Sequence, residues 1–116
     1  MARVVAFIPD LLFGSNVVGA LRAAGHEVQL VSDPAGVASG DGADVVIVDL
    51  TADADDRIAA LGRLDLGAAR TLAFYSHVEA DVRAAAEAAG FDLVIPRSRM
   101  NREGADLVTR LADARE

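Results

Sequence analysis

The sequence contains no cysteine and no lysine, and each absence restricts the chemistry available to it. Without cysteine, disulfides, thiolate catalysis, Cys-zinc sites and iron–sulfur clusters are excluded. All 11 basic residues are arginine, so Schiff-base chemistry and a phosphate-binding loop of the P-loop type, which need a lysine, are excluded as well.

Basic charge and long apolar runs are also missing. The formal net charge is −7, whereas a domain that binds nucleic acid usually presents a basic face. No apolar run approaches the roughly 18 residues of a membrane span, and the first eight residues resemble a strand rather than a signal peptide. We therefore expect no nucleic-acid partner, no membrane partner and a cytoplasmic location.

The chain has 116 residues, of which 53% are hydrophobic and 25% charged. This is the size of one compact domain, and the apolar content is too high for a disordered chain. We expect a single domain over residues 1–116, with no separate substrate domain.

Short β-rich runs alternate with longer helical stretches along the chain. The expected strands are residues 4–8, 27–31, 44–50, 71–75 and 91–95. The first expected helix follows a cap at Gly14-Ser15-Asn16. Three more are expected over residues 55–64, 78–89 and 101–114, and residues 33–42 hold only a short helix or a loop. This alternation predicts an α/β fold, a flavodoxin-like (βα)5 three-layer sandwich with a parallel five-stranded sheet in the order 2-1-3-4-5. The alternating pattern of strand 27–31 indicates a half-exposed edge strand.

Ligands of such sheets bind beyond the carboxyl ends of the strands. The residues expected at that edge are Asp10, Asp49, Thr51, Ser76, His77, Arg97 and Ser98. A carboxylate pair, hydroxyl groups and a guanidinium are thus expected to meet at one edge of the sheet.

Three segments resemble the receiver domain of bacterial response regulators, and the resemblance extends over the whole chain. Residues 45–50 resemble the receiver strand that ends in the phospho-accepting aspartate, here Asp49. Residues 88–97 resemble the passage that ends in a Lys-Pro pair, with Arg97 and Ser98 at those two positions. Residues 23–28 resemble the turn from the first helix to the second strand.

The sequence also departs from the receiver pattern. Receivers end their first strand with two acidic residues that hold Mg²⁺, but here Ile8 and Pro9 take those places and Asp10 follows one step late. Receivers carry a Thr or Ser after their fourth strand, and that position falls at Tyr75 or Ser76 here. Arginine is not equivalent to lysine, because its planar fork needs more room. Direct pairing of Arg97 with Asp49 would lock the domain in one state.

A second resemblance covers residues 13–28, which are similar to the first helix of extended short-chain dehydrogenases or epimerases. Only the last glycine of that family's fingerprint matches, at Gly14, because Ile8 and Leu11 occupy the earlier glycine positions. Asp33 would take the place of the acidic residue that binds the ribose of the dinucleotide in that family. An anion at the start of the first helix, near Gly14, is the simpler form of this alternative.

Several of these residues have a purely structural interpretation as well. Asp10 is expected to bind backbone amides in the turn before Gly14, and Ser76 to cap the helix that starts near Val78. His26 is expected to be solvated. The basic cluster of Arg97, Arg99 and Arg102 is either a solvated helix start or a contact for an anion or an acidic partner.

The function that we expect is an atypical receiver-like regulatory module, a pseudo-receiver, that contacts a protein or senses a small anionic ligand. It would have no enzymatic activity and no ordinary Mg-dependent aspartyl phosphorylation, with Asp49 as the phosphoacceptor-like residue. One alternative is a functional phosphorelay receiver phosphorylated on Asp49; the other is a small nucleotide- or anion-binding Rossmann-like protein. No cofactor or metal site is expected, and Mg²⁺ enters only if the acidic site is functional. From the resemblance, a homodimer through the surface of the fourth helix, fifth strand and fifth helix is a further expectation.

Overall fold

Five parallel strands form one sheet at the centre of the molecule. The computed structural model describes residues 2–38, 42–76 and 78–114. The strands are β1 (Arg3–Phe7), β2 (Glu27–Val31), β3 (Val45–Asp49), β4 (Arg70–Tyr75) and β5 (Leu93–Pro96). Their order is β2-β1-β3-β4-β5, so the flavodoxin-like fold predicted from the sequence is confirmed. All four pairings are parallel, and every strand therefore ends at the same edge of the sheet.

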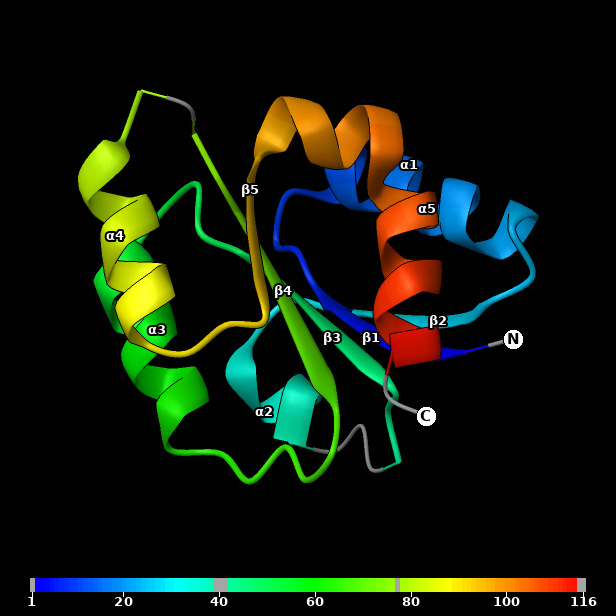
Figure 1. The fold of residues 1–116 in the computed structure, drawn as a ribbon, viewed down its shortest axis with the longest axis horizontal. Coiled ribbons are helices and arrows are strands. Elements are labelled where there is room, and N and C mark those ends of the chain that lie inside the picture. Colours follow the sequence, from blue (N-terminus) through cyan, green and yellow to red (C-terminus); the bar gives the residue numbers. More distant parts are fainter. Residues whose placement is uncertain (1, 39–41, 77, 115–116) are drawn as a thin grey trace.

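Helices cover both faces of the sheet. As Figure 1 shows, α1 (Leu11–Ala23) and α5 (Arg97–Ala114) lie together on one face. The other face carries α2 (Pro34–Ala38), α3 (Ala54–Gly62) and α4 (Ala80–Ala88) (Figure 1). Among the described residues, no helix is both long and apolar enough to cross a membrane.

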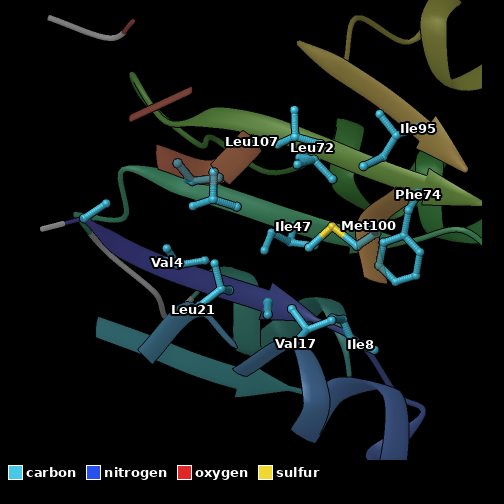
Figure 2. Close-up of a cluster of buried hydrophobic side chains, with 14 of the residues drawn as sticks. Val4, Ile8, Val17, Leu21, Ile47, Leu72, Phe74, Ile95, Met100 and Leu107 are labelled. Atoms are coloured by element: carbon cyan, nitrogen blue, oxygen red, sulfur yellow. The ribbon is translucent and has the colours of Figure 1, made fainter. Parts of the chain in front are cut away.

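The hydrophobic core is split into two layers by the sheet. The layer beneath α1 and α5 includes Ile47, Leu72 and Met100, whose side chains meet between the strands and α5 (Figure 2). The opposite layer includes Val46 and Leu61. All five residues of β3 are buried, while those of β2 are at least partly exposed. This contrast fits a central strand and an edge strand, as the hydrophobic patterns predict.

Two helices begin several residues earlier than the sequence predicts. α1 begins at Leu11, because the carboxylate of Asp10 accepts a hydrogen bond from Phe13 N at 3.1 Å and caps the helix. The expected cap at Gly14-Ser15-Asn16 is therefore wrong. α5 begins at Arg97, directly after β5, rather than at Asn101.

The start of α4 also differs from the prediction, whereas two helix ends agree with it. Glu79, not Ser76, holds the N-cap position of α4, and the Glu79 side chain makes no capping hydrogen bond. Gly25 and Gly90 follow α1 and α4 with φ angles of 93° and 92°. Glycine adopts this left-handed conformation without strain, which ends the helices where the sequence predicts.

His26 is buried, so the expectation that it is solvated is wrong. Its Nδ1 accepts a hydrogen bond from Ala2 N at 3.1 Å, and its Nε2 lies 2.9 Å from Thr109 Oγ1. The Thr109 hydroxyl in turn donates to the carbonyl of Ala105, which leaves it to accept from Nε2–H. The imidazole therefore joins the residue before β1 to the middle of α5.

Candidate functional site

Most of the polar residues predicted for the site follow the carboxyl ends of the strands. Asp49 is the last residue of β3, Ser76 follows β4, and Arg97 follows β5. Since all strands end at the same edge, Asp49 and Arg97 lie at one end of the sheet. His77 lies outside the described residues. Within the described part of the chain, the predicted residues lie in two clusters and a groove.

The first cluster is centred on Asp49, which is only 3% exposed. Its Oδ1 accepts a hydrogen bond from Thr51 N at 2.8 Å and a second from Thr51 Oγ1 at 2.5 Å. The carboxylate is thus held by the residue two positions later in the chain, in a local turn of the type that aspartate commonly forms.

The cation of this cluster is Arg57, from α3. Its Nη1 lies 3.8 Å from Asp49 Oδ2 and donates a hydrogen bond to the Asp49 backbone oxygen at 2.9 Å. The guanidinium carbon also lies 5.5 Å from the centre of the Phe7 ring. Both carboxylate oxygens of Asp49 therefore have partners inside the domain.

Arg57 is not among the residues predicted for the site. A signal for it exists in the helical spacing, because Arg57 shares the inward face of α3 with Ala54, Ile58 and Leu61, which pack against the core. A charged residue within an apolar stripe needs a buried partner. The spacing does not identify that partner.

The second cluster joins the start of α1 to the start of α5. Arg97 Nη2 lies 3.6 Å from Asp10 Oδ2, and both side chains are about half exposed, at 49% and 51%. The Arg97 guanidinium lies 4.3 Å from the centre of the Phe13 ring. Arg97 thus pairs with Asp10, and among the described residues Asp49 has its ion pair with Arg57.

A groove of about 490 Å³ opens beside this second cluster. The residues that line it are Phe13, Asn16, Ser76, Arg97, Ser98 and Asn101. The groove brings together three of the predicted residues, Ser76, Arg97 and Ser98. Asp10, Asp49 and Thr51 are not among the described residues that line it.

The donor set at this edge does not fit the Mg²⁺ ion of receiver domains. Mg²⁺ prefers carboxylate oxygens and water in octahedral geometry. At the end of β1 the chain offers Ile8, which is fully buried, and Pro9 in place of two carboxylates. Asp10 and Asp49 already bind backbone or hydroxyl donors and arginines. Within the described part of the chain, no group of three or more His, Asp or Glu residues is placed to hold a metal ion.

The glycine that suggested dinucleotide binding has a packing role instead. Gly14 lies inside α1 and is buried. A Cβ atom at this position would stand 3.1 Å from Leu30 Cδ1 and 3.3 Å from the Ile8 carbonyl oxygen. Gly14 therefore permits α1 to approach β1 and β2 closely, and the carboxylate of Asp10 already occupies the helix start where an anion was expected.

Neither a family model nor a curated protein matches this sequence. Solved structures do resemble it. The receiver domain of a Francisella response regulator matches with a TM-score of 0.84 at 13% identity, over 100% of both chains. A response regulator receiver protein from Burkholderia phymatum matches with a TM-score of 0.81 at 21% identity, over 97% of this chain and 96% of that one.

A longer protein contains a similar unit. NtrX from Brucella abortus, in a structure with ADP, matches with a TM-score of 0.84 at 15% identity over 98% of this chain. This chain spans only 26% of NtrX. Together with the observed strand order, these likenesses show that the chain has the fold of a response regulator receiver domain.

Proposed function

We propose that this chain is a receiver-like regulatory domain that acts through contact with a protein or a small ligand, without Mg-dependent phosphorylation of Asp49 and without enzymatic activity. The observation that carries this proposal is the state of the Asp49 carboxylate. It is buried, Oδ1 accepts two hydrogen bonds from Thr51, and Oδ2 faces Arg57.

Phosphorylation of an aspartate requires a carboxylate oxygen that is free to attack a phosphorus atom in line with the leaving group. Oδ1 of Asp49 is engaged by two donors, so attack from this oxygen would first break both hydrogen bonds. Attack from Oδ2 would displace Arg57, whose side chain is only 14% exposed. A guanidinium stacked on Phe7 and hydrogen-bonded to the backbone resists such displacement.

The end of β1 supports the same proposal. Receivers neutralise the phosphoryl oxygens with a divalent cation, and catalysis of phosphoryl transfer depends on that neutralisation. Here the first strand supplies no pair of carboxylates. One oxygen of Asp10 caps α1, and the other pairs with Arg97. Arg57 takes the role of the positive charge next to Asp49.

As a regulatory domain, the chain would signal through a surface rather than through a reaction. A protein partner in the cytoplasm is proposed on the likeness to receiver domains. A homodimer through α4, β5 and α5 is the form that the resemblance suggests. The molecular mass in solution, measured by light scattering, tests whether the homodimer forms.

The direct test is intact-mass spectrometry after incubation with acetyl phosphate and MgCl2. We expect no phosphoryl adduct on the wild-type protein, while an active receiver domain treated in parallel gains one. A wild-type adduct that disappears in Asp49→Asn would establish the alternative, a functional phosphorelay receiver.

A further inference from the structure

The groove between α1 and α5 is a feature of this edge that the Asp49 cluster does not explain. Its volume of about 490 Å³ lies within the range of roughly 300–1,000 Å³ typical of small-molecule sites. Of the six described residues that line it, only Phe13 is apolar; the others carry a guanidinium, two amides and two hydroxyls. Such a lining suits a polar ligand.

The buried Phe13 ring forms the base of the groove, and the Arg97 guanidinium lies over that ring. The Phe13 ring is only 7% exposed and packs against Phe74, with 5.2 Å between the ring centres. The Arg97 guanidinium lies over this ring at 4.3 Å. A cation held over an aromatic face is restrained in position, so Arg97 is partly oriented before any ligand arrives.

The polar groups of the groove have unused hydrogen-bonding capacity. Within the described part of the chain, no side-chain hydrogen bond is made by Asn16, Ser76, Arg97, Ser98 or Asn101. Arginine has five N–H donors in a planar fork that matches a carboxylate or a phosphate. The hydroxyl and amide groups can both donate and accept, as the hydroxyl groups of a ligand require.

The charges also favour an anion in the groove. Arg97 is the single charged residue among the described lining residues, so the charge within the groove favours an anion although the chain as a whole carries a net charge of −7. Its ion pair with Asp10 at 3.6 Å is half exposed, and exposed pairs of this kind contribute little. A bidentate oxyanion is therefore able to compete with Asp10 for the guanidinium.

We infer that this groove binds a small hydroxylated molecule that carries one carboxylate or phosphate group. The oxyanion binds Arg97, and the hydroxyl groups of the ligand bind the amides and hydroxyls of Asn16, Ser98 and their neighbours. This inference rests on the proposed function in one respect, namely that the domain responds to a ligand. Binding would draw Arg97 away from Asp10 and so couple the groove to the start of α1.

The test is a titration followed by two-dimensional ¹⁵N–¹H NMR, with glycerol 3-phosphate, glycerate and glycerol as probes. We expect saturable shifts confined to the amides around the groove with the phosphate, the carboxylate or both, and none with neutral glycerol. Which of the two anions binds more tightly identifies the oxyanion. The titration contains neither Mg²⁺ nor a phosphodonor, so its outcome is independent of the phosphorylation assay.

Three variants make the test specific to Arg97. Arg97→Gln should weaken binding about tenfold or more, because it removes a charged, bidentate donor. Arg99→Gln is the matched control, since Arg99 lies on the same helix but pairs with Glu103 at 3.3 Å, and its affinity should equal that of the wild type. Asp10→Asn should tighten binding, because it removes the competing carboxylate and keeps a capping side chain.

Three results would overturn the inference. They are the absence of saturable shifts with both anions at millimolar concentration, equal shifts with glycerol, and equal affinity in Arg97→Gln and the wild type. The NMR spectrum of each variant reports whether it is folded. If Arg97→Gln is unfolded, the comparison of Asp10→Asn with the wild type decides, and unchanged or weaker binding in Asp10→Asn counts against the inference.

Discussion

Arg57 and Asp49 are eight residues apart in the chain, yet the Arg57 guanidinium lies 3.8 Å from the buried carboxylate and donates to the Asp49 backbone oxygen at 2.9 Å. The pair connects the end of the central strand β3 to α3. Because both side chains are largely shielded from water, each depends on the other for its charge to be tolerated there. The positive charge beside Asp49 thus comes from α3, not from the start of α5.

Arg57→Met is expected to destabilise the protein by roughly 3 kcal/mol, because it leaves the buried Asp49 carboxylate without its counter-charge. Urea denaturation of the wild type and the variant measures the loss. In the Asp49→Asn background the same substitution should cost less, since the carboxylate charge is gone. Equal costs in the two backgrounds would show that the pair is not coupled.

Asp10→Ala is expected to lower the free energy of unfolding by about 1 kcal/mol, the usual effect of losing an N-cap. Asp10→Asn keeps a capping oxygen and loses only the exposed ion pair with Arg97, so its change should stay within about 0.5 kcal/mol. Thermal unfolding at low and high salt distinguishes the two contributions. A large, salt-dependent loss in Asp10→Asn would mean that the ion pair, not the cap, stabilises α1.

His26→Phe is expected to cost about 1–3 kcal/mol, because it leaves the buried Ala2 N–H and the Thr109 hydroxyl without their partner. Hydrogen exchange of the Ala2 amide should become faster by a larger factor than exchange in the middle of β3. Thr109→Val keeps the hydrogen bond from Ala2 N to His26 and removes the two that the Thr109 hydroxyl makes, so it is the matched comparison and should have the smaller effect on Ala2 exchange. An Ala2 amide that exchanges equally fast in His26→Phe and the wild type would argue against the hydrogen bond from Ala2 N to His26.

Gly14→Ala and Gly19→Ala should have opposite effects although both lie in α1. At Gly14 the new Cβ would press on Leu30 and the Ile8 carbonyl at 3.1–3.3 Å, whereas at Gly19 nothing lies within 4 Å. We therefore expect Gly14→Ala to destabilise the protein and Gly19→Ala to stabilise it by up to about 1 kcal/mol through helix propensity. Denaturant titrations of the two variants give the comparison, and stabilisation by both would contradict the close packing assigned to Gly14.

The periodicity of the sequence was sufficient to predict the fold. Continuous apolar runs such as 45–48 indicate buried parallel strands, the alternation at 27–31 indicates an edge strand, and Gly25 and Gly90 end helices because only glycine adopts their backbone conformation readily. These signals are local and depend on backbone and burial preferences. Helix starts were predicted less well, because Asp10 and Gly14-Ser15-Asn16 offer competing caps and the sequence does not show that the Asp10 carboxylate is the one that caps α1.

By itself, then, the sequence determined the strand order and the edge at which Asp49, Ser76 and Arg97 gather. Only the tertiary structure decided which charges pair: Arg57 with Asp49, and Arg97 with Asp10. It also decided that His26 is buried against α5 rather than solvated. The physical reason is that the sequence pattern around an arginine or histidine is the same whether its side chain is solvated or paired with another residue. The partner is set by side chains that converge only after helices from distant parts of the chain pack on the sheet.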